Sequence, residues 1–258
     1  MRQYIVDAFT DSLFSGNPAA ICISDHWLPD HTMQQIALEN HLSETAFAVP
    51  EMDFYRLRWF TPGGEIDLCG HATLACGYII LTQLEPQRQT VEFQTLSGQL
   101  TVTKCQDRYE MDFPAYSLQP VPVTQELIQA LGAQPQAAYL GRDLLCVFDQ
   151  EQAVRQLQPD LASVQELPGL LLHVTAPGQQ VDCVSRTFAP KCNVPEDAVC
   201  GSGHCHIVPY WAATLQKPEL IAYQASQRGG TLYCRLEGDR VKLGGKAVIY
   251  AISELFIA

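Results

Sequence analysis

A short pattern occurs twice in this sequence and constrains the fold more than any other feature. An Arg-x-Phe-small-Pro segment stands at 58–62 and again at 186–190. Each copy is followed by a glutamate and, four residues later, by a Cys-Gly pair that begins at Cys69 or Cys200. A repeated supersecondary unit is the usual origin of such a match. The pattern therefore predicts two similar halves.

A second match supports the duplication. Segment 97–102 resembles 229–234, and its offset differs by one residue from that of the two cysteines. The chain has 258 residues, 47% of them hydrophobic, which is enough for two cores of ordinary size. We predict an N-terminal half at 1–115, joined by the C-terminal strand, and a C-terminal half at 116–258.

Local patterns predict strands and helices in both halves, and hence an α+β fold class. Alternating and β-branched runs indicate the strands. An apolar helix is expected near 70–81, and a second follows Gly201-Ser202-Gly203, with Pro209 near its start or at a kink. The proline-rich segment 114–122 is the best linker candidate.

Charge and hydropathy exclude several classes of partner. The 16 Lys and Arg against 28 Asp and Glu give a net charge of −12, which repels phosphate backbones and anionic lipid. The longest apolar stretch, 72–81, is shorter than the roughly 20 residues that span a bilayer. The first residues lack the apolar core of a signal peptide. We expect a cytoplasmic protein with a small-molecule site, no nucleic-acid or membrane partner, and ten reduced cysteines.

The two Cys-Gly turns predict one kind of chemistry. A helix that begins there offers free N–H groups and a positive end, which favour a carboxylate or enolate and lower the pKa of a thiol. Cys69 and Cys200 could be the two acid/base groups of a racemase or epimerase that needs no cofactor. The alternative is that both are small buried residues.

A polar set of residues offers a different acid/base system. It comprises Glu44, His71, Asp197 and Ser202. Glu44 opens an otherwise apolar strand, where partial desolvation should raise its pKa toward neutrality. A solvated glutamate at a strand end is the alternative.

Other polar residues predict neither a metal nor a nucleotide. Cys200, His204, Cys205 and His206 crowd one turn, but zinc sites usually need a second ligand pair, so we predict no metal. The glycines around Ser202 lack the lysine of a phosphate loop. The arginine of each repeated pattern either binds a substrate carboxylate or pairs with a nearby acid.

At these motifs the chain resembles the PhzF family, the phenazine biosynthesis-like proteins related to diaminopimelate epimerase and proline racemase. The similarity runs nearly end to end. It includes segments 7–10, 16–20, 42–47, 58–62, 67–73, 185–190, 195–197, 201–205 and 209–211. The resemblance implies a diaminopimelate epimerase-like fold with two pseudo-symmetric halves. Each is a curved sheet or barrel around a central helix, with the active site in the cleft between them and commonly a homodimer.

The resemblance also implies a reaction and its residues. The founding phenazine enzyme is similar to a proton-shuttling isomerase without metal or organic cofactor. Its catalytic glutamate falls on Glu44, and the supporting His, Asp and Ser fall on His71, Asp197 and Ser202. The family's usual Asp-Pro-Val-Thr-Gly-Ser departs here at two positions, Ala198 and Cys200.

The second departure matters because the Cys200 turn resembles the second catalytic cysteine turn of the epimerases and racemases. We expect substrate contacts from Asn17, Gly70, Gly201 and Gly203.

Three hypotheses for the function follow. The first is a PhzF-like isomerase without cofactor that uses Glu44 on a small carboxylated or amino-acid-like substrate. The second is a two-cysteine amino-acid racemase or epimerase that uses Cys69 and Cys200. The third is a small-molecule-binding protein without catalysis.

Overall fold

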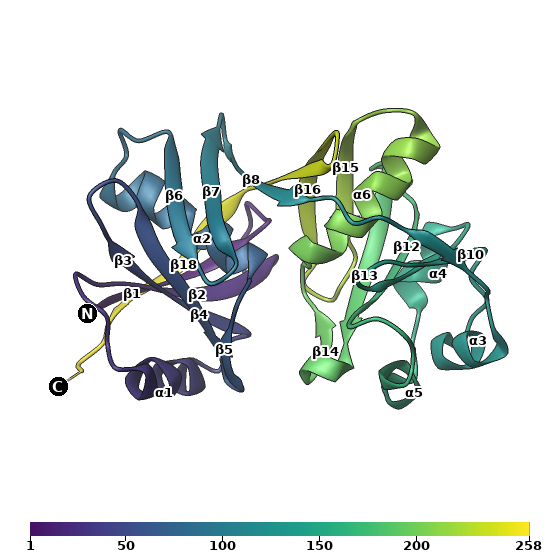
Figure 1. The fold of residues 1–258 in the computed structure, drawn as a ribbon, viewed down its shortest axis with the longest axis horizontal. Coiled ribbons are helices and arrows are strands. Elements are labelled where there is room, and N and C mark those ends of the chain that lie inside the picture. Colours follow the sequence, from purple (N-terminus) through teal and green to yellow (C-terminus); the bar gives the residue numbers. More distant parts are fainter. Residues whose placement is uncertain (258) are drawn as a thin grey trace. The chain divides into compact units, whose positions relative to one another are not determined.

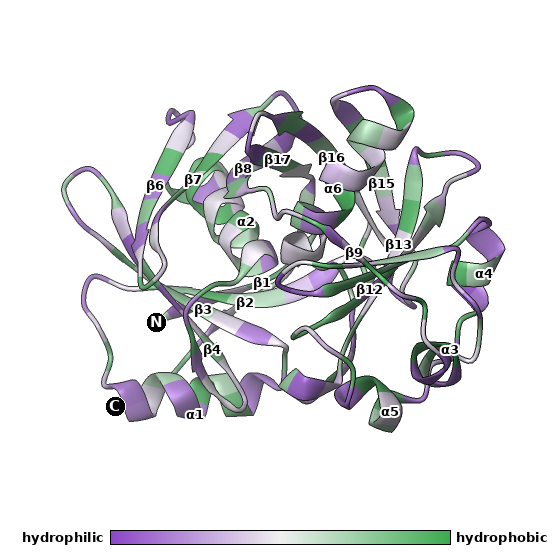
Figure 2. Ribbon diagram, turned by 45° about the vertical axis from the view of Figure 1, so that its right-hand side comes forward, coloured by the Kyte–Doolittle hydropathy of each residue, from purple (hydrophilic) through white to green (hydrophobic). Residues whose placement is uncertain are grey.

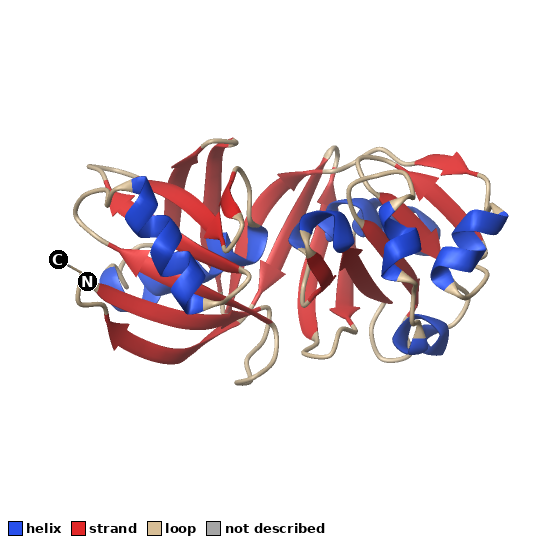
Figure 3. Ribbon diagram, turned by 90° about the horizontal axis from the view of Figure 1, so that it is seen from below, coloured by secondary structure: helices blue, strands red, loops and turns tan. Residues whose placement is uncertain are grey.

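The computed structural model describes residues 1–257, and their contacts divide into two compact units. Unit 1 contains Met1–Asp112 and the described residues from Gly244 onward, and unit 2 contains Phe113–Leu243. Both units combine strands and helices (Figures 1 and 3). No helix among the described residues is long and apolar enough to span a membrane.

Unit 1 is a sheet with one buried helix and one outer helix. Its helices are α1 (Asp30–Asn40) and α2 (Gly70–Ile79), which continues into a π-helical turn, η1 (Ile80–Leu84). Its strands are β1 (Arg2–Ala8), β2 (Asn17–Ile23), β3 (Glu44–Pro50), β4 (Tyr55–Thr61), β5 (Gly64–Ile66), β6 (Thr90–Thr95), β7 (Gly98–Cys105), β8 (Arg108–Pro114), whose last residues belong to unit 2, and β18 (Ala247–Glu254).

The sheet of unit 1 curves around α2. The helix packs against β1, β2, β3, β7 and β18, and nearly all of its side chains are buried. A helix that is apolar on every side must be enclosed, which explains this wrapping. Helix α1 instead buries only one stripe, at Met33 and Ala37, and Figure 2 shows hydrophilic and hydrophobic segments alternating along it.

Unit 2 also combines strands with short outer helices and one long, largely buried helix. Its helices are α3 (Gln125–Leu131), α4 (Glu151–Gln156), α5 (Leu161–Gln165), the 3-10 turn η2 (Pro190–Cys192) and α6 (Gly201–Leu215). Its strands are β9 (Gln119–Val121), β10 (Ala137–Leu140), β11 (Leu144–Val147), β12 (Leu172–Pro177), β13 (Cys183–Ala189), β14 (Val194–Asp197), β15 (Glu219–Gln224), β16 (Gly230–Glu237) and β17 (Arg240–Gly245), which ends in unit 1.

The strand pairings repeat between the units and confirm the predicted duplication. In unit 1, β2 and β3 are parallel, β3 and β4 antiparallel, and β4 and β6 parallel. In unit 2, β11 and β12 are parallel, β12 and β13 antiparallel, and β13 and β15 parallel. Helices α2 and α6 each begin at the glycine of a Cys-Gly pair. The fold class is thus the predicted one.

The repeated arginines are held in ion pairs. Arg58 donates from Nε and Nη2 to both carboxylate oxygens of Glu65, at 2.6 and 2.7 Å. Arg186 does the same with Glu196, at 2.7 and 2.9 Å. Of the two alternatives raised by the sequence, the structure therefore shows pairing with nearby acids.

The proline-rich segment 114–122 is docked on unit 2, so the prediction of a linker was wrong. Pro209 lies inside α6 and has no N–H, so the carbonyl of Cys205 loses its usual helical donor. The N–H of Tyr116 donates to that carbonyl at 3.0 Å. A few residues later the chain forms β9, which pairs with β10. The proline thus creates the attachment point for the segment.

One glycine tests the close packing around α2. A Cβ on Gly77 would lie 2.6 Å from the side chain of Val102 on β7. Alanine in a helix interior is normally more stable than glycine by about 1 kcal/mol. We expect Gly77→Ala to do the opposite and to lower the free energy of unfolding by about 1–3 kcal/mol, measured in urea. Gly63→Ala, with only an ordinary contact at 3.5 Å, is the control. A Gly77→Ala variant as stable as wild type would contradict this packing.

Candidate active site

Glu44 and His71 form the centre of the candidate site in unit 1. Glu44 is the first residue of β3, and His71 is the second residue of α2. The Nε2 atom of His71 lies 3.0 Å from Oε2 of Glu44, and their side chains are only 7% and 16% exposed. Two titratable groups that sequence analysis placed in one set are therefore in direct contact.

Two further predicted residues lie at the other ring nitrogen of His71. The amide Nδ2 of Asn17 is 3.1 Å from Nδ1, and Sγ of Cys69 is 3.6 Å from it. When Nδ1 carries no proton, it accepts from Asn17. When Nδ1 is protonated, it donates to the sulfur of Cys69. Both protonation states of His71 thus have a partner, which suits a residue that holds and releases protons.

The charge state of this pair differs from the sequence prediction. Burial alone would raise the pKa of Glu44, but the charge of His71 and hydrogen bonds with His71 and Ser43 bring it below the usual 4.5. Burial alone would lower the pKa of His71, but the carboxylate charge of Glu44 and hydrogen bonds with Cys69 and Glu44 raise it well above 6.5. The expected upward shift for Glu44 was wrong because the sequence did not show its imidazolium partner.

The two cysteines also differ from the prediction. Burial and the charge of Glu44 raise the pKa of the Cys69 thiol. Burial and the adjacent Asp197 raise the pKa of Cys200 well above 9.0. The expected lowering by the helix ends was wrong because desolvation of these buried thiols is the larger effect. Both cysteines are neutral thiols near pH 7.

Gly70 is the first residue of α2, and the remaining predicted residues gather at the start of α6 in unit 2. The Cys200 sulfur caps the helix by accepting from the N–H of Gly203 at 3.3 Å, and it lies 3.4 Å from Oγ of Ser202. Asp197 on β14 interacts with the Cys200 thiol. A Cβ at Gly203 would come within 2.8 Å of the His173 ring, so close packing already accounts for this glycine.

Sequence analysis missed a polar cluster beside Ser202, made of the partly exposed Arg142 and the buried Asp143 and His173. Arg142 donates from Nη2 to Ser202 Oγ at 3.1 Å and to Asp143 at 2.7 Å. Asp143 is fully buried and also contacts Nε2 of His173 at 3.2 Å. An Arg-Asp pair directly before an apolar strand is a weak signal, because the sequence does not reveal that the strand begins beside α6.

Two sets of side chains could in principle hold a metal. The possible ligand atoms of Glu44, Cys69 and His71 lie within 4.8 Å of one another, as do those of Asp143, His173 and His206. The second set is occupied by protein contacts: Arg142 and His173 contact Asp143, and both nitrogens of His206 contact backbone groups. The first set remains a possible site for an added ion.

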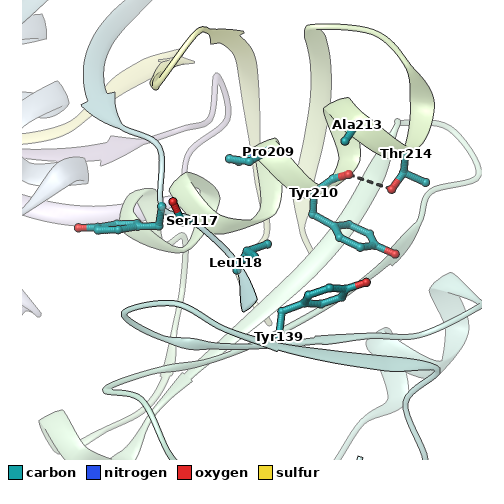
Figure 4. Close-up of a pocket in the computed structure, with 8 residues that line it drawn as sticks. Ser117, Leu118, Tyr139, Pro209, Tyr210, Ala213 and Thr214 are labelled. Atoms are coloured by element: carbon teal, nitrogen blue, oxygen red, sulfur yellow. Dashed lines mark hydrogen bonds between the residues drawn. The ribbon is translucent and has the colours of Figure 1, made fainter. Parts of the chain in front are cut away.

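An open groove lies elsewhere on unit 2. Its volume is about 460 Å³, and its lining residues come from the Tyr116 segment, β10 and α6. Figure 4 shows Tyr139 and Tyr210 there, with ring centroids 5.3 Å apart. None of the predicted site residues lines this groove. The chemistry described above therefore does not depend on it.

Comparison with known proteins identifies the family. The family of phenazine biosynthesis-like proteins, PhzC-PhzF, matches residues 6–252. The chain belongs to this family. A similar protein of Pseudomonas aeruginosa, named an uncharacterized isomerase, is 48% identical and is matched over 95% of each chain. A mouse phenazine biosynthesis-like domain-containing protein is 37% identical over 95% of this chain and 96% of its own.

Solved structures agree with this PhzC-PhzF assignment. A PhzF family protein from Enterococcus faecalis has a TM-score of 0.98 and 46% identity, with 99% of each chain covered. A hydroxyproline epimerase from Agrobacterium vitis has a TM-score of 0.66 at 11% identity, with 99% of this chain and 90% of that chain covered. The second likeness shows the fold alone, and it confirms the predicted relation to the epimerase and racemase folds.

The ion pair predicts a pH dependence of stability. Because the pKa of His71 is higher in the folded protein than the unfolded value of 6.5, its contribution is complete below pH 6.5 and is lost as pH rises through the folded pKa. We expect the free energy of unfolding to fall above pH 6.5 more steeply in wild type than in Glu44→Gln. Urea unfolding at several pH values measures both slopes, and equal slopes would contradict the pairing.

Proposed function

We propose that this protein is an isomerase without cofactor that moves a proton on a small carboxylated or amino-acid-like substrate. The contact between Glu44 and His71 at the start of α2 carries the proposal. A carboxylate beside an imidazolium is a base and an acid in one partly buried place, which proton transfer at carbon requires. Relatives named as isomerases support the same reaction class.

The chain's own groups suggest how the proton moves. The lowered pKa of Glu44 keeps its carboxylate ionised and able to accept a proton from a substrate carbon. Returning that proton to a different carbon completes an isomerisation, in which no atom or electron is lost. His71 balances the charge of the Glu44 carboxylate before the transfer and can relay a proton at Nδ1.

We further propose that the other residues implied by the resemblance support the same reaction. Ser202 and the N–H groups of Gly70, Gly201 and Ser202 would hold developing negative charge, and Asp197 would tune the site. Asn17 and Gly203 would contact substrate, as the resemblance implies. The cytoplasmic location and the homodimer stay predictions.

The two-cysteine reaction has less support. A racemase of that kind needs one thiolate to remove a proton and one thiol to donate one. The raised pKa values of Cys69 and Cys200 make both groups proton donors near pH 7. Glu44 is the group in this set whose pKa favours the basic form.

Glu44→Gln is the direct test. The purified protein is incubated, under reducing conditions in deuterated water, with a panel of amino acids and cyclic or unsaturated carboxylic acids. Loss of carbon-bound hydrogen is followed by NMR. We expect Glu44→Gln to lower exchange by about 10²–10⁴-fold. Glu51→Gln, one residue beyond the other end of β3 and exposed, is the matched control and should behave as wild type.

The cysteine variants separate the alternatives. Cys69→Ser and Cys200→Ser should keep most of the exchange if Glu44 is the base. Loss of exchange in both, with a mild effect of Glu44→Gln, would establish the two-cysteine reaction instead. A wild-type protein that exchanges no member of the panel would favour binding without catalysis.

Metal removal gives an independent prediction. Because the proposed base is a carboxylate, treatment with EDTA should leave the exchange rate unchanged. Added Zn²⁺ should inhibit, since ligand atoms of Glu44, Cys69 and His71 lie within 4.8 Å of one another. Cys69→Ser should weaken that inhibition. Loss of activity on EDTA treatment, with recovery on adding metal, would contradict the proposed mechanism.

A further inference from the structure

Trp59 on β4 carries a buried hydrogen-bond donor that has no acceptor. The residue is 1% exposed, and its indole Nε1 has no hydrogen-bond partner among the described residues. The other buried tryptophan, Trp211, donates from Nε1 to Thr175 Oγ1 at 2.9 Å. Most buried N–H groups in native proteins are paired, because leaving one unpaired costs free energy. The indole of Trp59 therefore needs an acceptor that the side chains around it do not supply.

The strand register places Trp59 on the same face of the sheet as Glu44. Trp59 pairs with Ala46 on β3, and paired residues point to one face. Glu44 stands two residues before Ala46, so it shares this face. The opposite face packs against α1, where Phe60 joins the cluster around Met33. Glu44 and Trp59 are thus diagonal neighbours, about 7–8 Å apart in such sheets and within reach of long and aromatic side chains.

The carboxylate of Glu44 offers an acceptor that is itself short of a partner. Its Oε2 is buried and, apart from His71 at 3.0 Å, has no partner among the described residues. The two orphaned atoms do not bond to each other, since neither has a hydrogen-bond partner. Ala46, opposite Trp59, is a single methyl group and leaves room beside the indole. A small molecule that both accepts and donates would join the two atoms.

We propose that Trp59 is a positioning residue for Glu44 and acts through a bound water molecule. The indole N–H donates to the water oxygen, and the water donates to Oε2. Water suits this position because it can also accept from Glu44 once the carboxyl group is protonated, so both states keep a partner. The inference rests on the proposed role of Glu44 as base, but the water is detected without turnover.

The first experiment observes the water directly. Protein labelled with 15N-tryptophan gives three indole signals, one for each tryptophan, and Trp59→Phe identifies the signal of Trp59. We expect a rotating-frame Overhauser cross peak between this N–H and water, with the sign that distinguishes close contact from proton exchange. Glu44→Gln should shift the Trp59 signal and leave that of Trp27 unchanged, because Trp27 packs on the α1 side of the sheet.

A pair of alanine variants tests where the water lies. Ala46→Val should remove the cross peak, because the added methyl groups occupy the space beside the indole. Ala48→Val is the matched control, since Ala48 lies on the same face of β3 and pairs with the apolar Leu57. It should keep the cross peak.

The exchange assay gives a second readout. Trp59→Phe should lower the exchange rate about fivefold with KM unchanged, which corresponds to one hydrogen bond. A panel on which wild type is silent would count against the isomerase proposal, whereas the water cross peak would still decide this inference.

The inference has clear contrary outcomes. A wild-type protein without the cross peak between the Trp59 N–H and water would overturn it, as would a cross peak that persists in folded Ala46→Val. A Trp59 signal that does not respond to Glu44→Gln would also overturn it. If Ala46→Val does not fold, judged by circular dichroism, the wild-type cross peak and its response to Glu44→Gln decide the question.

Discussion

Each unit depends on enclosing a helix that is apolar on nearly every side. Helix α2 has few polar residues and packs against strands from several parts of unit 1. Burial of such a helix provides much of the hydrophobic free energy available to a unit of this size. Its first turn is the exception, because the backbone N–H groups there have no acceptor within the helix and need other hydrogen-bond acceptors. Polar side chains therefore collect where the helix begins, beside Cys69 and His71.

Helix α6 is subject to the same constraint and meets it with different residues. Its first turn is capped by Cys200 and contacted by Ser202 and Arg142. The scaffold tolerates this change because the strand pairings and the Arg-Glu ion pairs are the same in both units. A duplicated frame has thus kept its structural ion pairs while the residues at its two helix ends have diverged. The divergence places an acid/base pair in one unit and an arginine paired with a buried aspartate in the other.

Much of the fold was predictable because its signals are local or repeated. The Cys-Gly turns marked the first residues of α2 and α6, and the repeated arginine pattern marked β4 and β13. The docking of the 114–122 segment was not predictable, since it depends on a contact between Tyr116 and Cys205 that is distant in sequence. A proline-rich composition is equally typical of a free linker and of a segment held by hydrogen bonds to distant parts of the chain.

In the candidate site, too, contacts between residues distant in sequence could not be predicted. Its members could be chosen from the sequence, but their charges could not, because a pKa depends on which partner lies within a few ångströms. Glu44 alone in an apolar strand would be a weak acid held neutral by burial. With the imidazole of His71 at 3.0 Å it is an ionised base. The pKa values of the two thiols shift upward instead, because the effect of burial is larger than the lowering effect of the helix N-termini. Pairing thus decides which of two chemically reasonable sets carries the negative charge, and that charge distinguishes a base from a proton donor.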